Sequence, residues 1–146
     1  MSIYELIRAV AAGLDTPNSV YFGTSKEQNT KVDQETGIII YINHPIVQTP
    51  NILPSQQFQS VYELQVLFAK PTAELDQSQD AETDFRQMQL LAYEFVRDLK
   101  NYEVSNKPAC DVSIGKMMDV YQQFDALFTG TVLSMRVTIN ETVFVC

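Results

Sequence analysis

Pairs of carboxylates are the residues of this sequence best suited to chemistry, because hydrolysis of a glycoside needs two carboxyl groups held at a fixed separation in a cleft. Two of the pairs fall where a long helix is expected to begin, and the helix dipole favours negative charge there without any catalytic role. The third pair flanks the expected end of a strand, where a turn-forming or interface role is the default. An enzyme that uses this third pair stays an alternative. The pairs are Glu74/Asp76, Glu82/Asp84 and Asp119/Asp125.

Other groups that carry out catalysis or hold cofactors are scarce. His44 is the only histidine, so the sequence offers no second imidazole for a triad or a metal site. Cys110 and Cys146 lack the spacing of a zinc site, and we interpret both as free thiols in a reducing compartment. The five glycines are scattered and form no phosphate-binding loop. The sequence therefore predicts a protein that is not an enzyme and that holds no metal and no cofactor.

The charge of the chain argues against two classes of partner. With 18 acidic and 10 basic residues, the net charge is −8, and nucleic acid or an anionic membrane would repel such a chain. A solvated acidic surface is the simplest interpretation, and an inner surface that DNA passes without sticking is the alternative. The first residues have no basic segment followed by an apolar core, and no apolar run approaches the ~20 residues that cross a bilayer. We expect no contact with a membrane.

The elements that would position any site are clearest near the end of the sequence. Residues 131–140 alternate between apolar and mixed positions, which predicts a strand with one buried face. The turn before it is expected at residues 124–130. The buried face is expected to comprise Leu133, Met135, Val137 and Ile139, and the opposite face Val132, Ser134, Arg136 and Thr138.

Two helices are predicted from apolar residues at three- and four-residue spacing. A short helix over residues 2–13 begins at Ser2, a capping residue with Glu5 three positions later. The long helix spans about residues 80–101 and carries Arg97 and Lys100 in its last turn, where the dipole favours positive charge. Its core-facing stripe is expected to comprise Phe85, Met88, Leu91, Ala92, Phe95, Val96 and Leu99.

Four further segments are predicted to be strands, at residues 19–23, 37–43, 61–69 and 112–124. The last is expected to contain a bulge at Gly115 and Lys116. The segment 37–43 is apolar on both faces, so its strand is either central in the sheet or covered by a neighbouring subunit.

The segment 44–59 is predicted to form an extended loop. Its three prolines, Pro45, Pro50 and Pro54, are spaced too closely for a regular element. A loop of this length commonly has a function, such as reaching a partner. Residues 24–36 and 103–109 are expected to be irregular as well.

Together these elements predict one α+β domain over residues 1–146, with an antiparallel or mixed β-sheet packed against one long helix and a short N-terminal helix. The two long strands over 61–69 and 131–140 are expected to share the sheet that the helix covers.

This arrangement resembles the tail-completion or tail-terminator proteins of tailed double-stranded DNA bacteriophages, and it is similar to related head–tail joining proteins of the neck. The likeness follows the chain in order and covers nearly all of it. Its parts are an opening helix of the type Ile3-Tyr4-Glu5-Leu6-Ile7, a strand of the type Tyr62-Glu63-Leu64-Gln65-Val66 before a helix of the type Phe85-Arg86-Gln87-Met88, a helix end of the type Arg97-Asp98-Leu99-Lys100-Asn101, a closing turn and strand of the type Asp125-Ala126-Leu127-Phe128-Thr129-Gly130, and a tail of the type Val143-Phe144-Val145-Cys146.

The resemblance implies a structural virion protein without enzymatic activity. Proteins of this family form rings, often sixfold, that terminate the tail tube or join the tail to the head and leave an axial channel for DNA. It therefore implies a tail-terminator-like domain that assembles in the cytoplasm of the host bacterium. Its expected partners are copies of itself, as a hexamer or else a dodecamer, and neighbouring tail or neck proteins, while DNA passes through without sequence-specific binding.

The contact residues expected for such a ring come from four parts of the chain. They are Ile38, Ile40, Ile42, Pro45, Pro50, Pro54, Arg136 and Phe144. The alternative to a ring is a small non-enzymatic binding module that grips a protein partner with the loop 44–59.

Overall fold

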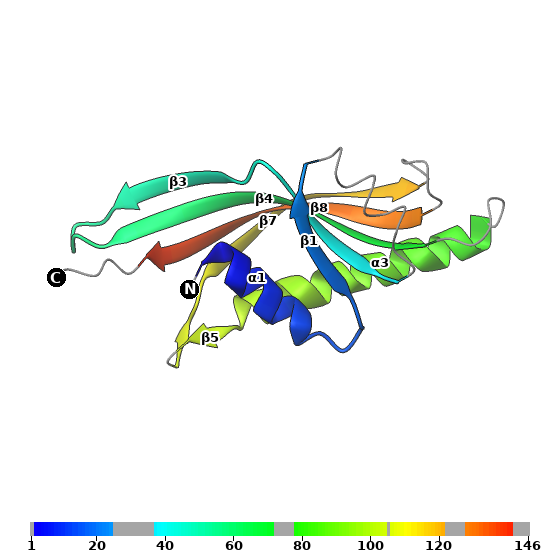
Figure 1. Ribbon diagram of the computed structural model, residues 1–146, viewed down its shortest axis with the longest axis horizontal. Helices are drawn as coiled ribbons and strands as arrows, with labels where there is room; N and C mark the ends of the chain where they lie inside the picture. Colours follow the sequence, from blue (N-terminus) through cyan, green and yellow to red (C-terminus); the bar gives the residue numbers. More distant parts are fainter. Residues whose placement is uncertain (1, 25–36, 72–77, 105, 122–127, 142–146) are drawn as a thin grey trace.

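Two long strands form the centre of the sheet in the computed structural model of this protein. β4 (Phe58–Pro71) and β8 (Phe128–Glu141) are antiparallel neighbours along their whole length. The prediction that these two segments share a sheet is confirmed, and both strands are longer than predicted. The residues that the structure describes are 2–24, 37–71, 78–104, 106–121 and 128–141 (Figure 1).

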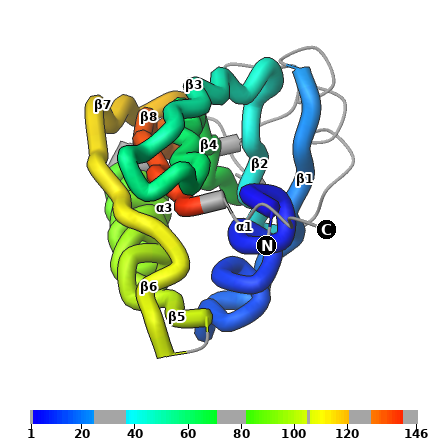
Figure 2. The backbone as a smooth tube through the Cα atoms, turned by 90° about the vertical axis from the view of Figure 1, so that its left-hand side faces the viewer, coloured from blue at the N-terminus to red at the C-terminus, as the bar shows by residue number. Residues whose placement is uncertain are grey.

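The sheet is mixed, and the two helices within the described residues both lie on the same side of it. Its strand order is β1-β2-β4-β8-β7, in which β1 (Ser19–Gly23) runs parallel to β2 (Ile39–Asn43) and β7 (Asp111–Tyr121) runs antiparallel to β8. An end-on view places β7 and β1 at opposite edges of the sheet and both helices on the same side of it (Figure 2). The predicted α+β class, with a mixed sheet against one long helix, is confirmed.

Both helices were predicted correctly from their periodicity. α1 (Ile3–Ala12) begins after Ser2, whose hydroxyl accepts a hydrogen bond from the backbone N–H of Glu5 at 3.1 Å. α3 (Ser78–Lys100) packs its predicted stripe on β4 and β8. Phe95 of that stripe meets Phe68 of β4 in an edge-to-face contact, with ring centroids 5.5 Å apart. The fully or nearly fully buried members of the stripe are Met88, Leu91, Ala92, Phe95 and Leu99.

The predicted alternation of buried and more exposed residues along β8 is confirmed. Two apolar clusters lie on the two faces of the sheet. The predicted inward residues of β8 are all buried in the main cluster with both helices. On the open face of the sheet a smaller cluster forms at one end, around Tyr41 and Leu67. Tyr41 is fully buried, and its hydroxyl donates a hydrogen bond to the carbonyl of Thr24 at 2.9 Å. The rest of the open face carries polar residues such as Glu63, Gln65 and Arg136 together with exposed apolar ones such as Met118.

The prediction of an extended loop over residues 44–59 is wrong. This segment contains β3 (Val47–Ile52), which pairs antiparallel with β4 and forms a hairpin with it. Residues 44–46 separate β3 from β2, so the two strands follow each other along the same side of β4. The proline rule failed because Pro50 lies in a strand that pairs on one side only, and an edge strand needs no N–H donor on its outer side.

Two smaller features differ in how well they were predicted. The bulge in β7 is confirmed, because its register with β8 shifts between Ile114 and Met117. The connector over residues 103–109 was expected to be irregular, but it forms a short hairpin of β5 (Glu103–Val104) and β6 (Lys107–Pro108). Residues 25–36 and 122–127, where a loop and a turn were predicted, lie outside the described residues.

Gly130 of β8 stands where β4 leaves no room for a side chain. A Cβ atom at this position would lie 2.7 Å from the carbonyl oxygen of Phe68 and 3.0 Å from the Cβ of Ala69. Both atoms belong to rigid strand β4. We therefore expect Gly130→Ala to lower the free energy of unfolding by about 1–3 kcal/mol, measured by urea denaturation. Gly37→Ala is the control, because nothing lies within 4 Å of its added Cβ. Equal stability of the two variants would contradict this steric argument.

Candidate assembly surface

The hairpin of β3 and the first part of β4, residues 47–62, extends past both helices toward one end of the molecule (Figure 1). We call it the arm. All six residues of β3 are exposed. The turn at the tip is held by two backbone hydrogen bonds of 2.8 Å, from Leu53 N–H to Gln57 O and from Gln56 N–H to Leu53 O. The arm is therefore a regular hairpin with much of its surface in solvent.

Two large apolar side chains lie exposed near the end of the arm. Ile52 of β3 and Phe58 of β4 are directly opposite each other in the register. Their exposed fractions are 69% and 37%. Because cross-strand partners lie on the same face of a sheet, they form one apolar surface, which we call the apolar tip. Covering it would be favourable, since burial of one such side chain contributes roughly 1.5–3 kcal/mol.

The arm also lacks charge. The sequence has no Asp, Glu, Lys or Arg between Glu35 and Glu63, although 19% of all residues are charged. An exposed hairpin in an acidic chain is expected to carry some of its charged residues. The centre of a protein–protein interface, in contrast, is depleted of charged residues. Exposure, apolar character and the absence of charge are properties that suit the arm to contact with another protein.

A groove of about 640 Å³ crosses the open face of the sheet. Glu63 and Arg136 meet on its floor, with Arg136 Nη2 3.0 Å and Nε 3.2 Å from Glu63 Oε1. Their side chains are 47% and 65% exposed, so this ion pair contributes at most about 1 kcal/mol to stability. Pro45 and Lys116 lie at opposite ends of the lining. Polar and apolar residues share the lining, and Glu63 is the only carboxylate among them, so the groove holds no pair of carboxyl groups.

One polar atom beside the groove is poorly satisfied. Asn43 donates from Nδ2 to Gln65 Oε1 at 3.2 Å. Its Oδ1 is buried and accepts no hydrogen bond within the described part of the chain. A buried acceptor without a partner costs about 1–3 kcal/mol.

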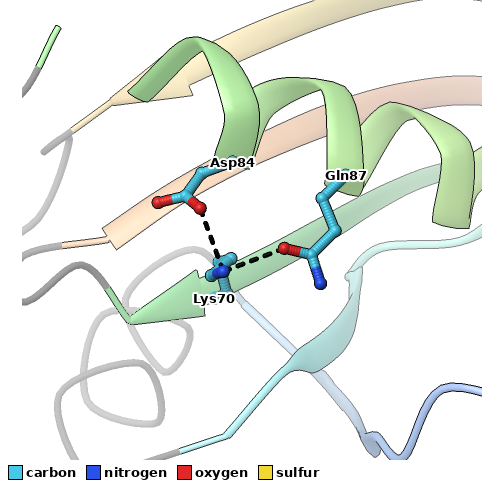
Figure 3. Close-up of polar contacts among 3 residues, drawn as sticks. All are labelled: Lys70, Asp84 and Gln87. Atoms are coloured by element: carbon cyan, nitrogen blue, oxygen red, sulfur yellow. Dashed lines mark hydrogen bonds and ion pairs between the residues drawn. The ribbon is translucent and has the colours of Figure 1, made fainter. Parts of the chain in front are cut away.

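The carboxylates that first suggested catalysis connect α3 to the sheet. Asp84 pairs with Lys70 of β4, with 2.9 Å between Oδ1 and Nζ, and the same ammonium donates to Gln87 Oε1 at 2.9 Å (Figure 3). Asp119 of β7 accepts hydrogen bonds from Gln89 Nε2 at 2.9 and 3.1 Å and from Thr131 Oγ1 at 3.0 Å. These partners hold the N-terminal half of the helix against the sheet.

Replacement of Asp119 tests this structural role. The hydroxyl of Thr131 is buried, so Asp119→Ala leaves it without its acceptor. We expect the free energy of unfolding to fall by about 1–2 kcal/mol, measured by chemical denaturation. Asp111→Ala, which removes an exposed carboxylate from the same strand, is the control. Unchanged stability of Asp119→Ala would contradict the role.

The remaining carboxylates of the predicted pairs are exposed or lie outside the described residues. Glu82 is exposed on α3. Glu74, Asp76 and Asp125 lie outside the described residues. Among those that the structure describes, no group of three or more His, Cys, Asp or Glu residues is placed to hold a metal ion.

His44 and Cys110 have surroundings that fit packing. The ring of His44 lies 6.1 Å from that of Tyr4 and 6.4 Å from that of Phe22, and the guanidinium of Arg8 lies 4.9 Å from the centre of the Phe22 ring. Cys110 is buried and donates to the carbonyl of Leu99 at 3.4 Å. Burial, and secondly the charge of Asp111, raise the pKa of the Cys110 thiol to about 11, so the nucleophilic thiolate is disfavoured at neutral pH.

The structure separates the residues that were expected to make subunit contacts. Ile40 and Ile42 are fully buried between β1 and β4, so the strand with two apolar faces is central in the chain's own sheet. Ile38 is half-buried at its start. Phe144 lies outside the described residues. The exposed members are Pro45, Pro50, Pro54 and Arg136.

The exposed members do not form one surface. Pro50 and Pro54 lie on the arm, whereas Pro45 and Arg136 line the groove. Sequence reasoning missed Ile52 and Phe58, because a segment taken for a loop has no predicted faces. The signal that could have identified them is the run without charged residues between Glu35 and Glu63.

Neither a scan against protein-family models nor a search of curated proteins found a match to this sequence. None of the described helices has both the length and the apolar character needed to cross a membrane.

Proposed function

We propose that this chain is a structural virion protein of a tailed bacteriophage, which forms a ring at the neck that terminates the tail or joins it to the head. The ring leaves a channel for DNA. The protein acts by assembly and has no enzymatic activity. Its partners are copies of itself, with a hexamer favoured over a dodecamer, and the adjoining tail or neck proteins. It assembles in the cytoplasm of the host bacterium.

The arm is the observation that carries this proposal. A hairpin that extends beyond the helices, carries no charge and ends in an exposed apolar pair is suited to contact another subunit. The order of elements, with a short helix, a strand before a long helix and a closing long strand, supports it further, because this order is the one that resembles the tail-terminator proteins.

A ring needs two different surfaces on every copy, because contacts within a ring of one chain are heterologous. The apolar tip supplies one surface. The second is β7 at the edge of the sheet, where Ile114 and Met118 are more than half exposed. Because the two surfaces do not overlap, one copy can use both at once, as a closed ring requires.

The charge of the chain supports a channel for DNA. A net charge of −8 repels phosphate groups over a distance of several ångströms, so DNA passes an acidic lining without being held. The same charge disfavours a function that depends on tight binding to nucleic acid.

The alternative is a small module that uses residues 44–59 to bind an unrelated protein. It rests on the same arm, now as a hairpin rather than a loop. The two proposals differ in the partner: the ring needs copies of this chain alone, whereas the module forms a stable complex of fixed stoichiometry with another protein.

Negative-stain electron microscopy of the purified chain at high concentration, together with native mass spectrometry, tests the proposal. We expect class averages with an open centre and a mass that is a multiple of six chains. A chain that stays monomeric across the concentration range and forms a one-to-one complex with an unrelated protein from its host would favour the binding module instead.

A further inference from the structure

The backbone of β3 has an inner side that bonds to β4 and an outer side that bonds to nothing among the described residues. Leu53 donates to the carbonyl of Gln57, and Leu53 follows directly on the register pair of Ile52 and Phe58. Bonded and non-bonded residues alternate along an antiparallel pair. Val47, Thr49 and Asn51 therefore direct their backbone groups toward β4, as Leu53 does.

The residues between them direct their backbone groups outward. These are Gln48, Pro50 and Ile52, and all three are exposed. Gln48 and Ile52 each present one N–H and one carbonyl, but Pro50 presents a carbonyl alone. The outer edge of β3 thus lacks its central donor, and the proline ring occupies the space that a neighbouring strand would need.

This arrangement penalises one particular contact between two copies. If two β3 strands paired antiparallel about their centres, Gln48 of each copy would face Ile52 of the other, and the two Pro50 residues would face each other. Each facing pair normally exchanges two hydrogen bonds. The central pair would exchange none, and its two carbonyls would be enclosed without donors, at about 1–3 kcal/mol each.

We propose that Pro50 determines how copies of this chain associate, because it prevents β3 from pairing with β3 of a second copy. Prolines on edge strands are one means by which proteins avoid unwanted strand addition. The arm is then available for contact through the side chains of its apolar tip. The block of strand pairing follows from the backbone of β3; only its importance for ring formation rests on the proposed function.

A β3–β3 pair would compete with a ring. It is an isologous contact that closes as a dimer, and the apolar tips would lie at the two ends of the paired strands. In such a dimer Ile52 of each apolar tip would lie beside Gln48 of the other copy, so each tip would be partly covered and less accessible to the heterologous contacts of a ring. An edge that cannot pair therefore keeps the chain in the state from which rings form.

Pro50→Thr restores the missing N–H with a residue that strands favour. We expect this variant to melt no lower than the wild type and to form a dimer in size-exclusion chromatography with light scattering, with an association at least tenfold stronger. In hydrogen exchange, the amides of Gln48, Thr at position 50 and Ile52 should become protected as the concentration rises.

Two variants serve as matched controls. Thr49→Val raises strand propensity, but its N–H faces β4, so we expect no added association. Pro54→Thr removes a proline from the same arm outside β3, with the same expectation. Dimers of Thr49→Val would show that a higher strand propensity is sufficient for association. Dimers of Pro54→Thr would show that loss of any proline in the arm is sufficient. A folded Pro50→Thr that associates no more than the wild type would overturn the proposal.

The result separates this inference from the proposed function. Rings of the wild type with an unchanged Pro50→Thr would leave the function standing and remove the role of Pro50. A monomeric wild type with a dimeric Pro50→Thr would support the role of Pro50 and count against the ring.

Discussion

Replacement of Ile52 and Phe58 together by lysine is expected to abolish the proposed ring assembly while the single chain stays folded. The two side chains form the apolar tip of the arm, are already exposed and contribute little to the chain's own core. Two charges at the centre of a contact remove its apolar burial and must be desolvated. A loss of about 3 kcal/mol for each contact corresponds to a roughly 100-fold weaker association, and a ring repeats that loss at every interface.

The measurement is the mass distribution by light scattering over a wide concentration range, with circular dichroism melting to verify the fold. The matched control is Leu90→Lys with Val104→Lys, which adds the same charge at exposed apolar positions on α3 and β5. We expect this control to assemble like the wild type. If both double variants lost assembly, net charge would explain the effect and the arm would have no special role.

Ile40→Asp is expected to prevent folding altogether. Ile40 is fully buried, with Val20 of β1 and Phe68 of β4 as its register partners, and its side chain belongs to the main apolar cluster. The variant loses the burial of the isoleucine side chain and places a carboxylate in an apolar cluster. Together these two effects lower the free energy of unfolding by several kcal/mol. Domains of this size are stable by only about 5–15 kcal/mol.

The expected result is a chain without a cooperative melting transition. Circular dichroism measures the transition, and poor dispersion of the amide NMR signals would show that the chain is unfolded. Ile40→Val, which removes one methylene, should cost about 0.5–1.5 kcal/mol. Ile114→Asp, at an exposed position of β7, should fold. A folded Ile40→Asp that had only lost assembly would mean that β2 lies at a subunit surface and not inside the sheet.

These two experiments distinguish positions that look alike in the sequence. Ile40 and Ile52 are both isoleucines in the uncharged segment between Glu35 and Glu63. The first has strands on both sides and helices above it, whereas the second lies near the tip of a hairpin that no described element covers. The two residues have the same hydropathy. Only their neighbours in the tertiary structure decide that Ile40 stabilises the core and that Ile52 is accessible to a partner.

Elements whose information is local were predictable. The three- and four-residue spacing of α3 and the period of two in β8 place the apolar residues on the side that is buried, and both patterns follow from the geometry of one element alone. Ser2 caps α1 through an atom three residues away. The bulge at Gly115 and Lys116 also has a local signal, because glycine interrupts an otherwise alternating strand.

The sequence by itself determined the α+β class, the two helices, the long strands and the lack of a motif for common catalytic chemistry, since periodicity, capping and motif spacing act over short stretches of chain. The tertiary structure alone decided that β2 is central, that Asp119 and Asp84 hold the helix to the sheet, and that residues 47–52 form a strand despite Pro50. Each of these depends on which strand lies alongside another. A proline disrupts the hydrogen bonds between two strands only where its missing N–H would have been a donor. Whether a position needs that donor depends on which strands lie at the edge of the sheet.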